Sequence, residues 1–169
     1  MKRVIIFCLI ITVSYSAHAQ SRNLQLHLGA DLIPGNAKNA YNGGGGVAVA
    51  YGFGAKKNGS AQVQAMYNFW KNKIASAGNL NLLMLQFGYK QGLGGSPVHV
   101  NVRTGAGYTF FGNGSGNHGH FNFATGLGYL VKTKSSDALD LNIDYNLLIG
   151  GQTTRTFLMV SLGYILALK

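Results

Sequence analysis

Apolar and polar residues alternate with a period of two along most of the chain after residue 20. In the stretch 97–110, Val98, Val100 and Val102 fall on one face, while His99 and Arg103 fall on the other. Successive side chains of a β-strand point to opposite faces, so this stretch predicts a strand with one apolar and one polar face. The same pattern recurs and predicts eight strands, at residues 22–32, 46–54, 61–70, 79–89, 97–110, 119–131, 138–149 and 155–168.

Alternating segments of about ten residues, separated by turn residues, are typical of a transmembrane β-barrel with an apolar outside and a polar inside. The pattern therefore predicts an all-β fold, an eight-stranded antiparallel up-and-down transmembrane β-barrel. The connections 55–59, 90–96 and 132–137 are short and carry lysine, which predicts that they face the periplasm together with both termini. On the opposite side, the loop 33–45 is the best candidate for a contact surface.

The first nineteen residues have the pattern of a secretory signal peptide. Lys2 and Arg3 precede an apolar run, and Ala17-His18-Ala19 forms a cleavage site for signal peptidase. We therefore expect a signal peptide over residues 1–19 and one barrel domain over 20–169. The only cysteine, Cys8, lies in the leader, so the mature domain contains no cysteine with which to form a disulfide or a zinc site.

Composition and charge agree with a barrel. Charged residues make up 11% of the chain, against about 25% in soluble domains. The net charge of +10 includes Lys2 and Arg3 of the leader, and the remaining lysines lie mostly in connections rather than in a stripe with aromatic residues. We therefore expect no nucleic-acid partner. Lysines at the rims are instead expected to meet anionic outer-membrane lipid and lipopolysaccharide.

Aromatic residues gather near the strand ends, where a transmembrane barrel carries two girdles. The residues expected in the girdles are Phe53, Phe69, Trp70, Phe87, Tyr89, Tyr108, Phe110, Phe121, Tyr129, Phe157 and Tyr164.

Polar residues on the inward faces predict a filled lumen. The expected network consists of His27, Asp31, His99, Asn101, Arg103, His120, Asn122, Asp140, Asn142 and Asp144. A buried charge needs a partner, so Arg103 is expected to pair with Asp140 or Asp144. His118 and His120 lack an evident third ligand, and we expect no metal, no cofactor and no catalytic residue.

The leader, a mature length of about 150 residues (169 less 19), eight strands and aromatic girdles resemble the small outer-membrane barrels of the OmpX and OmpA-transmembrane-domain type. The Ala19-Gln20 junction and the glycine-rich, acid-poor composition look like a barrel of the Bacteroidota. The resemblance implies a Gram-negative outer membrane and insertion by the barrel assembly machinery. One departure is that Leu168 and Lys169 stand where such barrels usually end in an aromatic residue.

Barrels of this size include lipid A deacylases and palmitoyl transferases, which use His with Ser and an acid. Here His99 and His120 are followed two residues later by Asn101 and Asn122 instead of Ser, and the chain has no Glu. The sequence favours a non-enzymatic structural or surface-interaction role with an unknown extracellular partner. The alternatives are a barrel enzyme or carrier acting on lipid, a narrow pore, and a soluble lipocalin-like barrel.

Overall fold

The computed structural model describes residues 22–33, 38–56, 59–74, 76, 78–112, 116–133, 137–150 and 154–168. The predicted leader, residues 1–19, lies outside the described residues. The eight strands are β1 (Arg22–Leu32), β2 (Tyr41–Lys56), β3 (Gly59–Asn72), β4 (Leu80–Gly92), β5 (Val98–Phe111), β6 (His118–Lys132), β7 (Ala138–Ile149) and β8 (Arg155–Leu168).

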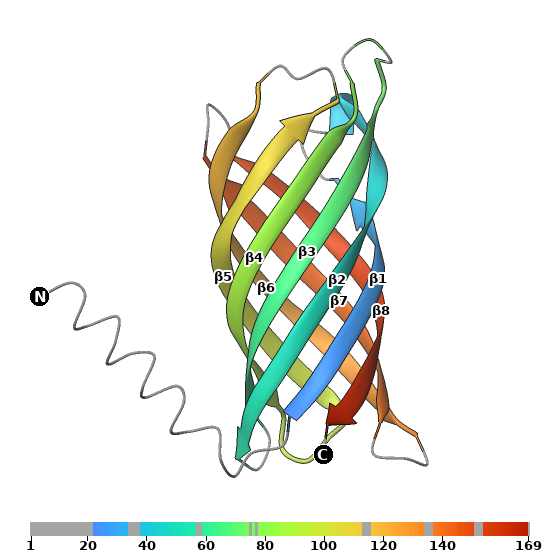
Figure 1. Cartoon of the computed structure of the whole chain (residues 1–169). Helices are drawn as coiled ribbons and strands as arrows, with labels where there is room; N and C mark the ends of the chain where they lie inside the picture. Colours follow the sequence, from blue (N-terminus) through green and yellow to red (C-terminus); the bar gives the residue numbers. More distant parts are fainter. Residues whose placement is uncertain are drawn as a thin grey trace, which may run out of the picture.

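Each strand pairs antiparallel with the next, and β8 pairs with β1, so the sheet closes into a barrel (Figure 1). The closing register runs from Arg22 opposite Leu168 to Leu32 opposite Leu158. Closure leaves no unpaired sheet edge, which is the condition for strands to lie in a membrane. The predicted fold class is confirmed.

The barrel has two distinct ends. The terminal end is the end at which β1 begins, near Arg22, and β8 finishes, near Leu168; the strand pairs β2–β3, β4–β5 and β6–β7 also turn here (Figure 1). The loop end is the opposite end, at which the chain passes from β1 to β2, β3 to β4, β5 to β6 and β7 to β8.

The predicted bounds of β1, β7 and β8 are confirmed, whereas β2 begins at Tyr41 rather than at residue 46. Residues 43–46 are all glycine and show no alternation, so the pattern could not reveal this part of the strand. Its neighbours define it instead, because Gly44 pairs with both Asp31 of β1 and Trp70 of β3.

The outer wall is apolar around all eight strands. Leu28 of β1, Leu127 of β6 and Ile143 of β7 are 68%, 59% and 56% exposed. Two threonines of the wall satisfy their hydroxyl groups by hydrogen bonds to the backbone. Thr104 Oγ1 donates to the Asn122 carbonyl at 3.2 Å, and Thr125 Oγ1 donates to the Asn101 carbonyl at 3.3 Å. A continuous exposed apolar surface of this extent marks a membrane-facing wall. None of the described helical segments is long and apolar enough to span a bilayer.

Two residues predicted for the aromatic girdles lie inside the barrel instead. Trp70 and Phe157 are fully buried, and their rings meet edge to face with centroids 5.1 Å apart. The prediction was wrong because a position near a strand end does not by itself place a side chain in the girdle. Successive side chains point to opposite faces of a strand, so Trp70 faces inward because Phe69 faces outward. The other predicted girdle residues are exposed or half-buried, namely Phe53, Phe69, Phe87, Tyr89, Tyr108, Phe110, Phe121, Tyr129 and Tyr164.

Glycines on the inward face let neighbouring chains approach. A side chain at Gly105 would collide with the carbonyl oxygen of Leu85 on β4 and approach the Gln86 Cα atom to 2.8 Å. At Gly126 it would collide with the Asp144 carboxylate. A small closed barrel has little interior room, so these positions stay without a side chain.

Candidate functional site in the barrel lumen

The lumen near the terminal end holds a network centred on Lys90. Its ammonium donates to Asp140 Oδ2 at 2.5 Å and to Gln25 Oε1 at 3.3 Å. His99 Nε2 lies 3.4 Å from the other carboxylate oxygen of Asp140 and 3.0 Å from Asn142 Oδ1. All five side chains are buried, and together they join β1, β4, β5 and β7 across the lumen.

Lys90 is a residue that the sequence reasoning missed. The sequence pattern predicts Lys90 in the connection 90–96 on the periplasmic side. In the structure β4 continues to Gly92, and Lys90 faces inward, 8% exposed. Its inward direction could be inferred from parity, because the inward residues Gly88 and Gln86 lie two and four positions earlier.

A second network crosses the middle of the barrel. Arg103 lies 2.7 Å from Asp144 Oδ2, so the predicted ion pair is present, and its other terminal nitrogen donates to Gln64 Oε1 at 3.2 Å. Gln64 donates to Gln86 at 3.4 Å, and Gln86 donates to Asn122 Oδ1 at 3.1 Å. These side chains come from β7, β5, β3, β4 and β6, and together they cross the lumen.

The lumen near the loop end combines an apolar cluster with buried polar side chains, among them Asp31, Asn68, Thr109, His120 and Asn146. The apolar plug is a buried cluster that includes Ile33, Tyr41, Met66, Trp70, Leu80, Leu82, Met84, Leu148, Phe157 and Met159. Adjacent inward positions such as Leu80, Leu82 and Met84 come from one strand, β4, whose inward face is polar only toward the terminal end. The large apolar side chains of the lumen are therefore concentrated toward the loop end.

Asp31 lies within this plug without a cationic partner. Its Oδ2 oxygen accepts hydrogen bonds from Asn68 at 2.6 Å and from the Trp70 indole at 2.7 Å. Trp70 Nε1 can only donate, so the carboxylate supplies the acceptor that a buried indole requires. This contact explains why Asp31 and Trp70 occur together in an otherwise apolar layer.

The structure places all ten predicted network residues inside the barrel, but in separate groups. His99, Asn101, Asp140 and Asn142 form one group, while Arg103, Asn122 and Asp144 belong to the middle network. His27 lies 3.4 Å from Gln25, and His120 lies 3.1 Å from the Thr109 hydroxyl. Asp31 is apart, in the plug.

The lumen histidines have no acyl-transfer partner among the described residues. The side-chain contacts of His27, His99 and His120 involve Gln, Asn, Asp and Thr, and no described serine hydroxyl bonds to them. Thr109 contacts His120, but the remaining ring nitrogen of His120 has no acceptor to orient it. Within the described ranges, no three His, Cys, Asp or Glu side chains gather as metal ligands.

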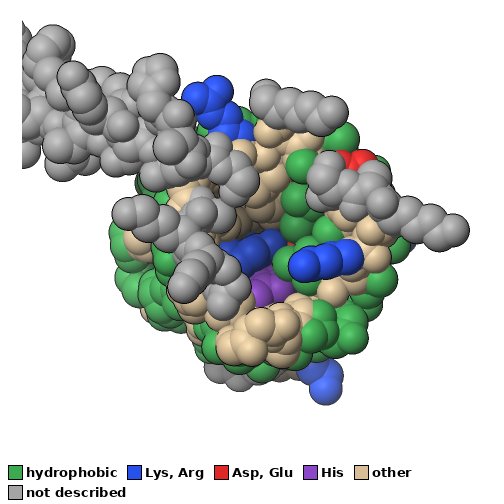
Figure 2. All heavy atoms as spheres, turned by 90° about the horizontal axis from the view of Figure 1, so that it is seen from below, with side chains coloured by type: hydrophobic (Ala, Val, Ile, Leu, Met, Phe, Trp, Pro, Cys, Tyr) green, Lys and Arg blue, Asp and Glu red, His purple; other side chains and the backbone are tan. Residues whose placement is uncertain are grey.

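A view onto the terminal end shows the lumen hollowed, with Lys or Arg and His side chains inside a ring of hydrophobic side chains (Figure 2). The side chains of Lys90 and His27 lie in this part of the lumen and are 8% and 7% exposed. The lumen is therefore hollowed at the terminal end, and the apolar plug lies on the opposite side of the Lys90 network, toward the loop end.

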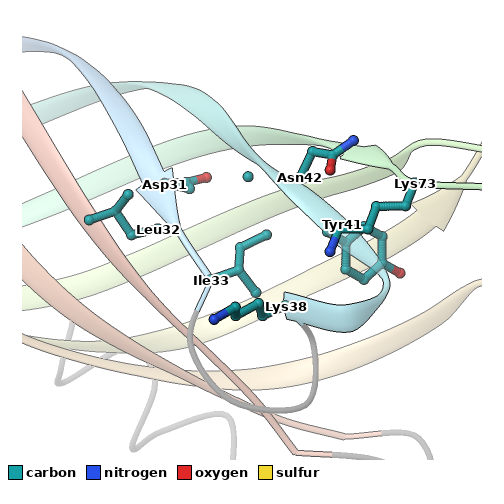
Figure 3. Close-up of a pocket in the computed structure, with 8 residues that line it drawn as sticks. Asp31, Leu32, Ile33, Lys38, Tyr41, Asn42 and Lys73 are labelled. Carbon is teal, nitrogen blue, oxygen red and sulfur yellow. The ribbon is translucent and has the colours of Figure 1, made fainter.

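A separate pocket of about 270 Å³ lies at the loop end, beside the start of β2. Lys38 and Lys73 line it together with Asp31, Ile33 and Tyr41 (Figure 3). Sequence reasoning singled out loop 33–45 as a contact surface; of this loop, residues 34–37 lie outside the described residues.

Comparison with known proteins identifies the architecture. No protein-family model matches the sequence, and no curated protein matches it. Among solved structures, Neisserial surface protein A has a TM-score of 0.64 at 17% identity, covering 88% of this chain and 99% of that chain. The N-terminal β-barrel domain of Pseudomonas aeruginosa OprF has a TM-score of 0.58 at 12% identity, covering 85% and 97%. The Yersinia pestis outer membrane protein Ail has a TM-score of 0.56 at 11% identity, covering 85% and 99%. The fold of this chain is therefore that of eight-stranded outer-membrane barrels.

Proposed function

We propose that this protein is an integral outer-membrane protein of a Gram-negative bacterium with a non-enzymatic role. It stabilises the envelope or presents its loop end at the cell surface. The observation that carries the proposal is the combination of an apolar wall on all eight strands with a lumen closed by buried side chains. Such a molecule offers surfaces rather than a passage.

The wall argues for a membrane rather than a soluble carrier. A soluble eight-stranded barrel holds its apolar residues inside, around a ligand. Here leucine, isoleucine and valine line the outside, while Asp140, Asn142 and Asp144 are buried inside. Outer-membrane lipid and lipopolysaccharide are then the natural surroundings of the wall, and the barrel assembly machinery would insert the chain after export with its leader removed.

The closed lumen argues against a pore. The ion pair of Arg103 and Asp144, with the glutamines beside it, crosses the middle of the barrel. Toward the loop end, the plug around Trp70 and Phe157 contains only one ionisable carboxylate, Asp31. An eight-stranded barrel has an interior just wide enough for side chains to fill. Here buried side chains occupy the middle of the barrel and the part toward the loop end.

A surface role agrees with what the structural neighbours are called. One is named a surface protein, and another is described as an attachment invasion locus protein. Their sequence identity to this chain is too low to imply that it binds the same partners. The candidate contact surface is therefore the loop end of this chain itself. The alternative of a lipid-modifying enzyme has no supporting observation among the histidine contacts described above.

The proposal is tested by expressing the full chain, isolating outer membranes and comparing gel mobility in SDS with and without heating. A folded barrel resists SDS, so we expect a heat-dependent shift in the outer-membrane fraction, and protease added to intact cells should cut only at the loop end. Recovery of the protein in the soluble periplasm, without a mobility shift, would contradict the proposal.

A further inference from the structure

Arg155, at the start of β8 and the loop end, forms no ion pair with any of the residues that the structure describes. It lies on the inward face, and its guanidinium carbon is 5.7 Å from the centre of the Phe111 ring. One terminal nitrogen, Nη1, is buried and has no hydrogen-bond partner among the described residues. A desolvated guanidinium nitrogen without an acceptor is costly, so this position favours a bound acceptor.

No carboxylate side chain of the chain is left to supply that acceptor. The sequence has only four acidic residues, and each is engaged elsewhere. Asp140 pairs with Lys90, and Asp144 pairs with Arg103. Asp137 accepts from Tyr164 at the terminal end, and Asp31 accepts from Asn68 and Trp70.

Further basic and polar groups surround the same mouth. The Arg155 guanidinium lies over the Phe111 ring, and Phe111 follows Thr109 by two positions on β5, where the Thr109 hydroxyl lies 3.1 Å from His120 Nδ1. The rings of Tyr41, Trp70 and Phe157 pack in series, and Phe157 follows Arg155 by two positions on the same face of β8. His120 is 7% exposed, and its Nε2 atom is buried without a partner. Tyr41 is also one of the residues that line the pocket together with Lys38 and Lys73 (Figure 3). Arg155, Lys38 and Lys73 supply three positive charges and Asp31 one negative charge, which leaves a net charge of +2.

We propose that the loop end binds a phosphate- or sulfate-bearing ligand with at least two charged groups. Arg155 and the free nitrogen of His120 would hold one oxyanion, and Lys38 and Lys73 the other. Guanidinium matches the oxygens of phosphate or sulfate in a fork, while lysine supplies compact charge. The apolar walls from Ile33 and Tyr41 fit the carbon skeleton that joins the two groups.

Two sources share this chemistry, a lipid headgroup of the surrounding leaflet and a free phosphorylated or sulfated glycan. The test uses the protein purified from outer membranes in detergent. In one arm, calorimetry measures binding of inositol hexakisphosphate, a soluble polyphosphate. In the other, native mass spectrometry counts phosphatidic acid molecules retained from mixed micelles, with phosphatidylcholine as the neutral reference.

Arg155→Gln is expected to weaken binding about tenfold or more, because a charge-assisted contact is lost. Arg155→Lys keeps the positive charge but loses the forked guanidinium geometry, so its affinity should lie between those of the native protein and Arg155→Gln. Lys71→Gln is the matched control, since Lys71 is exposed, lies at the same rim and does not line the pocket. It removes the same charge and should leave affinity within about twofold. The double variant Lys38→Gln/Lys73→Gln tests the second group if Arg155→Gln fails to fold.

If only inositol hexakisphosphate binds in an Arg155-dependent way, the ligand is a free anion. If only phosphatidic acid does, the ligand is a lipid headgroup. No binding in either arm, or equal weakening by Arg155→Gln and Lys71→Gln, would overturn the proposal. This inference rests on the proposed function only in placing the loop end outside the cell. Loss of the heat shift would reject the outer-membrane barrel, whereas a heat-shifted barrel that binds neither probe would reject the anion site alone.

Discussion

At the scale of single residues, the lumen is organised by charges that depend on one another. Lys90 with Asp140, and Arg103 with Asp144, are pairs in which every side chain is at least nine-tenths buried. Replacing a buried pair by apolar residues can be neutral, but removing one partner leaves a charge in a low-dielectric interior. The two pairs should therefore respond very differently to single and to double substitutions.

Asp140→Asn is expected to lower the free energy of unfolding by about 3 kcal/mol, because the Lys90 ammonium loses its counter-ion. Adding Lys90→Met should recover a large part of that loss. Urea unfolding in detergent micelles, followed by the change in gel mobility, measures both. A double variant as unstable as Asp140→Asn alone would show that the ammonium is not the source of the penalty.

Trp70 is the only tryptophan of the chain, so its fluorescence reports directly on where it lies. Because the indole is fully buried in the plug and bonded to Asp31, brominated acyl chains should quench it weakly. The combined variant Trp70→Phe/Tyr108→Trp moves the indole to an exposed wall position and should be quenched strongly. Strong quenching of the native protein would contradict the buried position and indicate that Trp70 faces the lipid in the aromatic girdle.

At the scale of elements, the period-two pattern was sufficient wherever side chains alternate in kind. It predicted β1, β7 and β8 with their observed bounds. In β1 and β7, Leu or Ile alternates with polar residues such as Gln, Asn and Asp, whereas in β8 the outward Leu158, Val160 and Leu162 alternate with Met159, Ser161 and Gly163. It failed in β2, where consecutive glycines carry no pattern, and the register with β1 and β3 defines the strand. It also missed the end of β4, where Lys90 was read as a loop residue.

Gly105→Ala should prevent or strongly impair barrel closure, because the added methyl group would collide with the β4 backbone at Leu85. Gly119→Ala is the control, since there the nearest atom, the Gly107 carbonyl oxygen, is 3.9 Å away. The yield of heat-shifted protein after refolding into micelles measures the effect. Equal yields for the two variants would contradict the inference of a tight β4–β5 contact.

Asp137 forms hydrogen bonds to the last strand, β8, at the terminal end. Its carboxylate accepts from the Tyr164 hydroxyl at 2.7 Å and from the Ala167 amide at 3.3 Å. Asp137→Ala should speed hydrogen exchange of the Ala167 amide while leaving Leu162, in mid-strand, protected. Unchanged exchange at Ala167 in an NMR measurement would show that strand pairing with Asn23 of β1 suffices without the carboxylate.

At the scale of the whole molecule, sequence reasoning could establish the barrel but not the division of its lumen. Inward direction follows from parity, so burial of His99, Arg103 and Asp144 was predictable. Which of them meet depends on the register around the closed sheet, because Lys90 and Asp140 lie on strands that are not neighbours. The plug depends on the same closure, which brings Trp70 of β3 against Phe157 of β8.

The closed lumen predicts an absence of ion conduction. In planar lipid bilayers, the reconstituted protein should give no current steps, with a sixteen-stranded porin as the positive control. Discrete steps that vanish when the sample is boiled beforehand would contradict the closed state and favour the narrow pore.

The apolar plug also decides where an electrical potential across the membrane would fall. The lumen is hollowed at the terminal end, so Lys90 and Asp140 would stay close to the potential of that compartment. The apolar side chains of the plug would carry a larger share of the voltage drop than this hollowed end. Asp31, which is hydrogen-bonded to Trp70 and also lines the pocket at the loop end, lies on the opposite side of that drop from Lys90 and Asp140.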